Sequence, residues 1–346
     1  MAGGRGSVAH AFSRSPFTEM KYRRLGKSGP HVSALAMGRG ATPIRFGEPM
    51  EQAFNETIAR AIDLGLNFFD SSDAYWGSRH EVLLGRALKG RRDRVMISSK
   101  FGNIDLPDGK KAVNGRPEYI PGACEASLKR LGVEVIDVYF LHRVDNSVPI
   151  EDTIGAMARL VEQGKVRWLG ICEASAETLR RAQRAHPLAA LQTEYSLWAR
   201  DVERSILPAC RELGISFMAY APLGRGLLTG RVKTVDDLPP GDRRRGHPRF
   251  LPENLARNVA LVKELEAVAA RNKASAAQIA LAWLLARGED VIPIPGTNHV
   301  QNLEQNVAAL GLVLNGSELE RLSEVFALGA GAGERYNPRL MKKWGI

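Results

Sequence analysis

The segment LNFFD ends an apolar run in Asp70, and Tyr75 follows five residues later. A free tyrosine has a pKa of about 10, which makes it a poor acid or base at neutral pH. A nearby ammonium lowers that pKa by stabilising the phenolate, and a carboxylate keeps a buried ammonium charged. Lys100 and His142 also end apolar runs. Asp70, Lys100 and Tyr75 therefore predict a tuned proton donor, and His142 could orient a substrate carbonyl by a hydrogen bond.

The sequence shows no motif for competing chemistries. It contains no activated nucleophile, no cluster with metal-ligand spacing, and no Walker A, H-E-x-x-H or G-x-S-x-G motif. A proton donor without a nucleophile or a metal suits reduction of a carbonyl, in which hydride comes from elsewhere. Such a hydride requires a nicotinamide cofactor.

These residues must be positioned by short strands that alternate with amphipathic helices. The expected strands are 32–37, 66–70, 95–100, 135–142, 166–171, 190–195, 216–221 and 291–295, and the expected helices are 50–64, 81–88, 117–131, 150–163, 176–186, 201–213 and 255–287. Leu-Gly pairs end several helices directly before a strand, because glycine readily takes the left-handed position that closes a helix. Eight strands with helical crossovers predict a (β/α)8 TIM barrel. A doubly wound open sheet is the alternative, although no G-x-G-x-x-G turn follows any strand.

Polar residues end six of the expected strands, after apolar runs that give no local reason for them. In a barrel the carboxyl ends of the strands form one mouth, which carries the chemistry. We therefore expect these side chains to converge there: Asp70, Lys100, His142, Cys172 with Glu173, Gln192 and Tyr220.

The composition is that of an ordinary globular protein. The 346 residues are 44% hydrophobic and 25% charged, and the formal charge is +10. The positive excess is concentrated in both termini and in 231–250, without a basic stripe interleaved with aromatics, so we expect no nucleic-acid partner. No apolar run is long enough to span a membrane. Three widely spaced cysteines indicate a reduced compartment, and we expect a cytoplasmic protein without a structural metal.

Seven ordered motifs resemble those of the aldo-keto reductase superfamily, and most closely its bacterial and plant branch of perakine-reductase-like and auxin-induced-type proteins. They are FFDSSDAYWG, ISSKFG, YFLHRVD, GICEAS, LQTEYSLW, AYAPLGRGLLTG and IPIPGTNHVQNLEQN. The similarity runs from Met20 to about Phe326. It implies a barrel with an N-terminal β-hairpin and NADPH-dependent reduction of aldehydes or ketones.

The resemblance also implies individual roles. Asp70, Tyr75, Lys100 and His142 match the catalytic tetrad. The cofactor-binding positions fall on Gly38, Arg39, Cys172, Glu173, Gln192, Tyr220, Pro222, Leu223, Gly224, Arg225, Gly226, Leu228, Gly296, Thr297, Asn298, Gln305 and Asn306. Among them Tyr220 matches the aromatic residue under the nicotinamide, and 223–228 the loop along the pyrophosphate.

Two departures from the family pattern affect the expected cofactor site. Cys172 replaces a serine, so a weak donor replaces a strong one. The positions that usually carry Lys or Arg for the 2′-phosphate are Gly296, Asn298, His299 and Asn302. Two alternatives therefore follow. The protein uses NADH, or the cluster 243–245 binds the 2′-phosphate of NADPH in place of the missing cations.

Two tryptophans are candidates for the substrate pocket. Trp76 follows the catalytic tyrosine where many relatives have glycine, and Trp198 follows the sixth strand. Together they suggest a flat apolar pocket for an aromatic aldehyde, with barrel packing as the alternative for either.

We divide the chain into an extension over 1–19, a barrel over 20–328 and a flexible basic tail over 329–346. The alternative function is a cofactor-sensing regulatory subunit on the same fold. The sequence does not distinguish the two, because such subunits retain the same residues.

Overall fold

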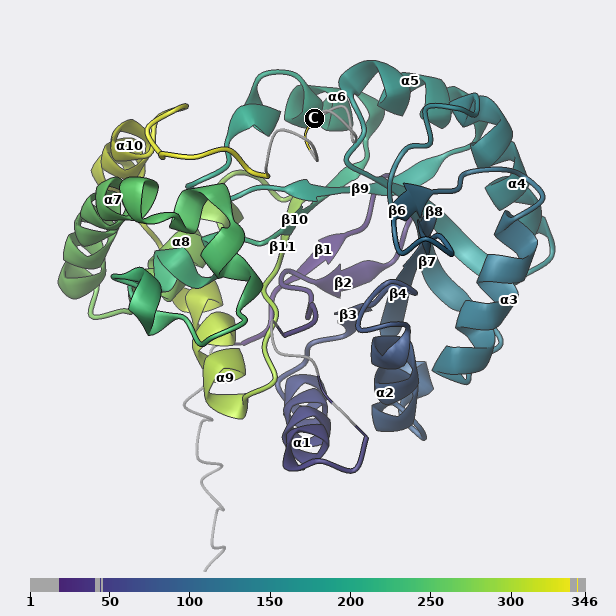
Figure 1. Ribbon diagram of the computed structural model, residues 1–346, viewed down its shortest axis with the longest axis horizontal. Helices are drawn as coiled ribbons and strands as arrows, with labels where there is room; N and C mark the ends of the chain where they lie inside the picture. The colour runs from purple at the N-terminus through teal and green to yellow at the C-terminus, as the bar shows by residue number, and fades with distance from the viewer. Residues whose placement is uncertain (1–18, 41–43, 45, 337–340, 342–346) are drawn as a thin grey trace, which may run out of the picture.

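The computed structural model describes residues 19–40, 44, 46–336 and 341. Its central sheet is parallel, in the order β11-β10-β9-β8-β7-β4-β3. The strands are β3 (Phe68–Asp70), β4 (Met96–Phe101), β7 (Ile136–Leu141), β8 (Val166–Cys172), β9 (Leu188–Glu194), β10 (Ser216–Tyr220) and β11 (Val291–Ile294). Segment 34–38 closes the ring, because Met37 pairs with Phe69 and Gly38 with Gly296. The predicted (β/α)8 barrel is confirmed (Figure 1).

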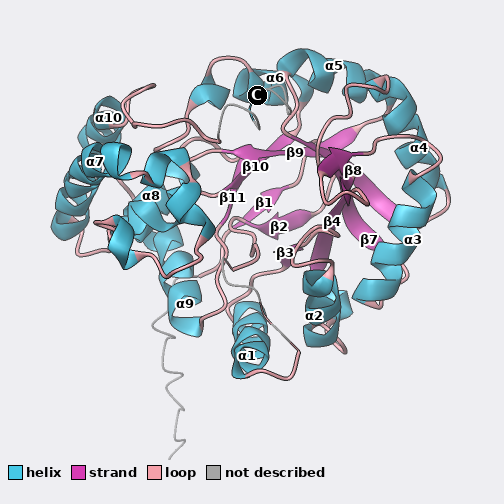
Figure 2. Cartoon of the chain, in the orientation of Figure 1, coloured by secondary structure: helices cyan, strands magenta, loops and turns pink. Residues whose placement is uncertain are grey.

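Helices surround this sheet, and successive ones pack side by side (Figure 2). They are α1 (Pro49–Asp63), α2 (Arg79–Ala87), α3 (Ile120–Leu131), α4 (Ile150–Glu162), α5 (Ala176–Ala185), α6 (Ile206–Leu213), α7 (Pro252–Arg271), α8 (Ala276–Leu285), α9 (Val300–Ala308) and α10 (Gly316–Val325). The N-terminal hairpin implied by the resemblance is present as β1 (Tyr22–Arg24) and β2 (His31–Ser33). Within the described ranges no helix combines the length and the apolar composition needed to cross a bilayer.

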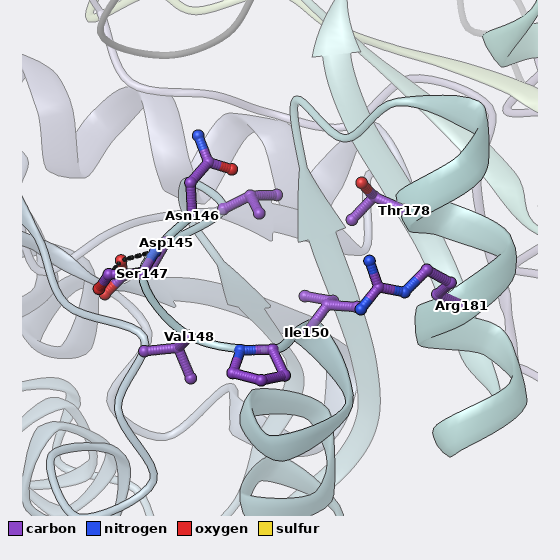
Figure 3. Close-up of a pocket in the computed structure, with 9 residues that line it drawn as sticks. Asp145, Asn146, Ser147, Val148, Ile150, Thr178 and Arg181 are labelled. Carbon is purple, nitrogen blue, oxygen red and sulfur yellow. Dashed lines mark hydrogen bonds between the residues drawn. The ribbon is translucent and has the colours of Figure 1, made fainter.

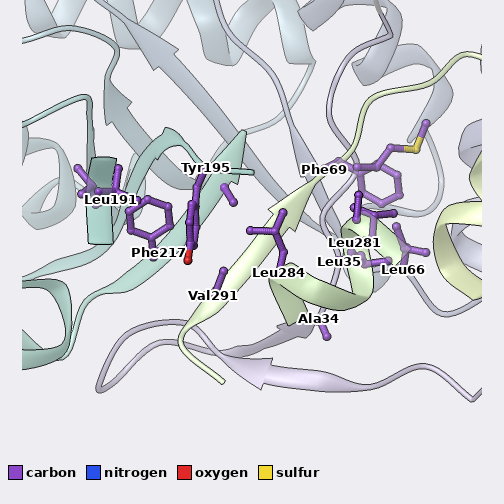
Figure 4. Packing of buried hydrophobic residues seen from close by; sticks show 14 of the residues in the cluster. Ala34, Leu35, Leu66, Phe69, Leu191, Tyr195, Phe217, Leu281, Leu284 and Val291 are labelled. Atoms are coloured by element: carbon purple, nitrogen blue, oxygen red, sulfur yellow. The ribbon is translucent and has the colours of Figure 1, made fainter. Parts of the chain in front are cut away.

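The barrel strands separate two apolar layers by alternation of side chains. Phe68, Val138 and Met218 belong to a cluster inside the barrel, which Leu25 and Val32 of the hairpin region join. Apolar residues next to members of this cluster in the strands belong to the other cluster, between the sheet and the helices. Phe69, Leu191 and Phe217 are examples (Figure 4). Because the period is two residues, every second residue of a strand faces the same interior.

Two glycines occupy positions where a side chain would be unfavourable. Gly132 takes φ +66° at the C-terminal end of α3, the left-handed position predicted for the Leu-Gly pairs. Gly170 on β8 faces Phe140, whose ring a Cβ at this position would overlap. The missing side chain thus makes room for an aromatic ring inside the barrel.

Several elements differ from the sequence expectation. The predicted helix over 255–287 is two helices, α7 and α8. Lys273 breaks it with φ +49°, and Ser275 begins α8 with a capping box. The first expected strand is divided between β2 and the closing segment. The hairpin β5 (Asn103–Asp105) to β6 (Lys111–Val113), and helices α9 and α10, were not predicted.

The predicted tail begins with residues that contact the barrel. Asn258 on α7 accepts a hydrogen bond from Ala332 N at 2.7 Å and donates one to Ala332 O at 2.9 Å. Residues 1–18, 337–340 and 342–346, which include all but one residue of the predicted extension and half of the predicted tail, lie outside the described residues. The domain boundaries therefore stay predictions.

Candidate active site

Strand register brings the predicted site residues to one mouth. Asp70 on β3 pairs with Ser98 on β4, and Lys100, two residues further along β4, pairs with Phe140 of the interior cluster. Cys172 pairs with Gln192 across β8 and β9. All of these residues share the inward face, which is the arrangement expected of polar strand ends in a barrel.

Lys100 is the centre of the candidate catalytic group. Its Nζ donates to Asp70 Oδ2 at 2.6 Å, to Ser71 O at 2.7 Å and to the Tyr75 hydroxyl at 3.1 Å. The Lys100 side chain is 0% exposed and Asp70 is 3% exposed. Ser98 and Gln192 donate to the other oxygen of Asp70, at 2.8 and 3.0 Å. A buried ion pair with every partner satisfied is rigid, and it fixes the tyrosine oxygen.

Burial sets the protonation of this group. It raises the pKa of Tyr75 above its usual value, and the attraction of Lys100 for a phenolate offsets this only in part. The sequence predicts that the charge of Lys100 would lower the pKa of Tyr75. Desolvation outweighs that charge, and the sequence does not show it. Burial opposes the charge of Lys100, but Asp70 and Tyr75 leave the lysine pKa above its usual value. Tyr75 is therefore a protonated phenol at neutral pH, hydrogen-bonded to a cation.

His142 lies next to this tyrosine as a neutral imidazole. The two rings meet edge to face with centroids 5.9 Å apart. Burial, followed by the positive charges of Lys100, Arg143 and Arg39, holds the pKa of His142 well below its usual range. A neutral imidazole has one N–H and can donate one hydrogen bond to a substrate oxygen.

The predicted carboxamide grip occupies neighbouring strand ends. The Gln192 amide lies against Asp70, and Cys172 is 3% exposed. Burial raises the pKa of the Cys172 thiol to about 12, so it stays protonated. Glu173 follows with φ +51°, a costly conformation for a residue with a side chain, and its carboxylate accepts from Glu194 N at 3.2 Å. These positions provide donors and acceptors suited to an amide.

A second charged cluster, which the sequence did not predict, surrounds Glu194 at the end of β9. Its carboxylate is bound by Arg225 at 3.2 Å, Arg249 at 3.1 Å and Arg335 at 3.4 Å. Arg335 also donates to Glu173 at 2.6 Å and to the Tyr220 hydroxyl at 3.3 Å. The residues come from three distant segments, so only the folded chain brings them together.

Tyr220 and the start of the predicted tail meet at this cluster. The hydroxyl of Tyr220 lies 3.0 Å from that of Tyr336. The guanidinium of Arg225 lies over the Tyr336 ring, 5.0 Å from its centroid. The sequence carried one signal for these contacts, an Arg-Tyr pair in a glycine-rich stretch, but the charge count placed this pair in the predicted flexible basic tail.

The glycine-rich loop after β10 is the predicted pyrophosphate site. Gly224, Arg225 and Gly226 all have positive φ, which folds the loop back on itself, and this turn forms the first half of η3 (Gly224–Thr229). Arg244 donates to Arg225 O at 3.1 Å while pairing with Asp242. The Nε of Arg225 is buried and has no hydrogen-bond partner among the described residues. A tight loop with two guanidinium groups fits a diphosphate.

The predicted adenosine motif follows β11 and leads into α9. Thr297, Asn298 and Asn306 are buried, and Gln305 is exposed. Arg231 extends from the far end of the glycine-rich loop, and its Nη2 lies 3.4 Å from Asn302 Oδ1. Arg231 thus brings a guanidinium from another loop to a motif that has no Lys or Arg at the expected positions. Within the cluster 243–245, Arg245 instead donates to Leu238 O and Pro239 O of its own loop.

Arg39, predicted near the cofactor, lies over the Tyr75 ring, 4.8 Å from its centroid. Gly38 and Gly296, both predicted cofactor positions, pair where the barrel closes.

The two tryptophans occupy different environments. Trp76 is half-buried and meets His80 edge to face, with centroids 5.1 Å apart. Its backbone has φ +54°, a conformation that favours glycine. Trp198 is 7% exposed and packs on Phe326 within the apolar cluster, which agrees with the packing alternative.

A surface hollow of about 410 Å³ lies beside the loop after β7, and Asp145, Thr178 and Arg181 are among its lining residues (Figure 3). It contains none of the tetrad residues. No group of His, Cys, Asp and Glu side chains suited to a metal ion occurs in the described part of the chain.

Comparisons with known proteins agree with this geometry. The model of the Aldo/keto reductase family matches residues 34–327. A probable aldo-keto reductase 1 from Glycine max is 44% identical over 317 residues, which cover 90% of this chain and 91% of that protein. A glycerol dehydrogenase from Gluconobacter oxydans superposes with a TM-score of 0.81 at 29% identity, over 89% of this chain and 95% of that one. A thermostable aldo-keto reductase crystallised with the inhibitor epalrestat gives 0.71 at 28% identity, over 88% and 100%.

Proposed function

Because the chain belongs to the aldo/keto reductase family, we propose that it reduces the carbonyl group of a small aldehyde or ketone with a reduced nicotinamide cofactor. One observation carries this proposal. The Tyr75 hydroxyl lies 3.1 Å from a lysine that is itself held by a buried carboxylate, at the mouth of the barrel. This group can deliver one proton and carries no nucleophile.

Each residue of the tetrad has a distinct task. When bound, the reduced nicotinamide supplies hydride to the carbonyl carbon. Tyr75 gives its proton to the carbonyl oxygen, and Lys100 stabilises the phenolate that remains. Asp70 keeps Lys100 charged and in place. His142 donates a hydrogen bond that orients the same oxygen.

The residues that would hold the cofactor follow the mouth of the barrel. Gln192, with Cys172 and Glu173 beside it, would bind the carboxamide, and Tyr220 would lie under the ring. The loop 223–228 would follow the diphosphate, where Arg225 and Arg244 supply positive charge. Thr297, Asn298 and Asn306 would line the adenosine end.

We favour NADPH over NADH because of Arg231. Its contact with Asn302 places a guanidinium beside the motif that binds the 2′-phosphate in this family. A 2′-phosphate requires such charge-assisted donors, whereas a ribose hydroxyl does not.

The pocket points to a flat apolar substrate. Trp76 directly follows the proton donor, where its half-buried ring would narrow the mouth, and an aromatic aldehyde would match such a flat surface.

The test is a turnover assay. Purified protein is mixed with NADPH or NADH and a panel of aromatic and aliphatic aldehydes, and cofactor oxidation is followed. We expect steady multiple turnover in the wild type and a loss of at least about 100-fold in Tyr75→Phe, because the general acid is removed. Cofactor binding by the variant, measured by fluorescence titration, should be retained.

The matched control is Tyr22→Phe, which changes an exposed tyrosine on the hairpin. Full turnover in Tyr75→Phe would disprove the assignment. A wild type that binds NADPH but completes at most one turnover would instead support the regulatory-subunit alternative.

A further inference from the structure

A serine hydroxyl connects His142 to a carboxyl group outside the tetrad. The Oγ of Ser72 lies 3.0 Å from His142 Nδ1 and 3.3 Å from Asp73 Oδ1. It also accepts a hydrogen bond from Ala74 N at 3.1 Å. Ser72 and Asp73 lie between Asp70 and Tyr75, in the catalytic loop, and the proposed reaction gives them no task.

The number of protons on Ser72 limits what this chain of groups can do. A hydroxyl donates one hydrogen bond and accepts two, and Ala74 N–H already uses one acceptor site. An ionised Asp73 can only accept, so it takes the Ser72 proton and requires His142 to donate from Nδ1. A protonated Asp73 donates to Ser72, which then donates to an unprotonated Nδ1. The two states of Asp73 therefore require different tautomers of His142.

We propose that Asp73 is a positioning residue that sets, through Ser72, which ring nitrogen of His142 carries the proton. With Nδ1 turned to Ser72, only Nε2 is left to face a substrate carbonyl, so the inference rests on the proposed reductase function. Uptake of one proton from solvent by Asp73 places the imidazole proton on Nε2, where it can be donated. When Asp73 loses its proton, the imidazole proton of His142 is instead on Nδ1, and Nε2 can only accept a hydrogen bond. Reduction is therefore favoured on the acid side of the transition.

The surroundings of Asp73 place this transition near neutral pH. The groups that face its carboxyl are Glu81 on α2, Arg130 on α3, Tyr119 before α3 and Tyr139 on β7. Burial and then the negative charge of Glu81 raise the pKa of Asp73 to about 7, against the opposing effects of Arg130 and of hydrogen bonds from Ser72 and Ala74. Asp73 is partly exposed, so it can exchange protons with water.

The charges around His142 keep the ring itself out of this titration. Burial, Lys100, Arg143 and Arg39 all disfavour the imidazolium. The ring therefore holds one proton on both sides of the transition, and only the position of that proton changes.

Nitrogen NMR of the uniformly 15N-labelled full chain reads the tautomer directly. The His142 signals are assigned by their loss in His142→Gln. We expect the Nε2–H tautomer at pH 5.5, the Nδ1–H tautomer at pH 8.5, and a midpoint near the pKa of Asp73. In Asp73→Asn the amide can donate to Ser72 at every pH, so the Nε2–H tautomer should persist throughout. Ser72→Ala should remove the pH dependence because the connection is broken.

Kinetics provide the second readout, which a merely structural loss would not reproduce. Wild-type kcat/KM for aldehyde reduction should fall about tenfold per pH unit above the transition. Asp73→Asn should keep its low-pH value through pH 8.5, so that it exceeds the wild type there. The control Asp63→Asn, at an exposed site on α1, should retain the wild-type profile.

The outcomes separate the two proposals. A His142 tautomer that stays the same from pH 5.5 to 8.5, or an Asp73→Asn profile that falls like the wild type, overturns this inference alone. A wild type without any turnover overturns the reductase function, while the NMR titration still reports whether Asp73 controls the tautomer.

Discussion

Two buried ionic centres lie at the same mouth of the barrel and are built differently. Asp70 has one cation, Lys100, which comes from the neighbouring strand at 2.6 Å. Glu194 faces three arginines, of which one lies in a glycine-rich loop, one before α7 and one near the C-terminus. The first centre is balanced in charge and held by the sheet, whereas the second has excess positive charge and is held by loops. We infer that the sheet fixes the proton chemistry and that the loops supply charge for an anionic cofactor.

Substitution of Lys100 should show the largest difference between the two centres. Lys100→Met should lower turnover about 1000-fold, because the proton donor loses its cation. It should also lower the free energy of unfolding by about 3–5 kcal/mol, since Asp70 is left buried and unpaired. Stopped-flow kinetics and urea denaturation measure the two effects. Lys89→Met, at an exposed site after α2, is the control. Turnover within tenfold of the wild type would show that the first centre does not carry the chemistry.

Substitution in the second centre should also have a large effect on stability but, unlike Lys100→Met, only a small effect on turnover. Glu194→Gln should cost about 3 kcal/mol of unfolding free energy, because three guanidinium groups lose their shared anion. Burial opposes the charge of Glu194, but Arg225, Arg335 and Arg249 hold its pKa below the usual value.

This lowered pKa gives the effect of Glu194→Gln a defined pH dependence. A carboxyl with a lowered folded-state pKa stabilises the fold above its unfolded pKa of about 4.3 and loses that contribution as pH falls. The difference between wild type and variant should therefore shrink from pH 6 to pH 3, as followed by thermal denaturation. Glu320→Gln, an exposed change on α10, should show no such trend. A constant difference would mean that packing, and not charge, stabilises this centre.

The two centres also differ in how far the sequence could predict them. The first follows from strand ends in a parallel barrel, because Asp70 and Lys100 lie on adjacent strands and share the inward face. The second depends on Arg249 and Arg335, whose positions are set by an irregular loop and by the docking of 331–336 on Asn258. Side-chain periodicity cannot predict the positions of residues in such segments, because they contain no α-helix or strand. The break at Lys273 was missed for a related reason, since the apolar pattern continues across it.

Trp76 tests whether the loop next to the first centre is strained. Its φ of +54° costs about 1 kcal/mol for a residue with a Cβ, whereas glycine adopts this conformation freely. Trp76→Gly and Trp76→Ala both lose the contact with His80 and widen the mouth. We expect the glycine variant to be more stable by about 1 kcal/mol in urea denaturation. The control is the exposed Ala74, where the wild type and Ala74→Gly give the same alanine–glycine comparison. A more stable alanine variant at 76 would show that the loop relaxes.

The smallest expected effect concerns how the loops of the second centre discriminate cofactors. Arg231 is exposed and reaches Asn302, so its ion pair with a 2′-phosphate is worth about 0.5–1 kcal/mol. Arg231→Ala should therefore raise the Kd for NADPH about two- to fivefold and leave that for NADH unchanged. Lys233→Ala is the matched control, because Lys233 is an exposed cation two residues along the same loop. Fluorescence titration at two salt concentrations measures both cofactors, and the NADPH effect should weaken at high salt. Equal loss of affinity for both cofactors would place Arg231 at the diphosphate. Unchanged affinity for both would mean that the neutral donors Thr297 and Asn298, and not Arg231, determine which cofactor binds.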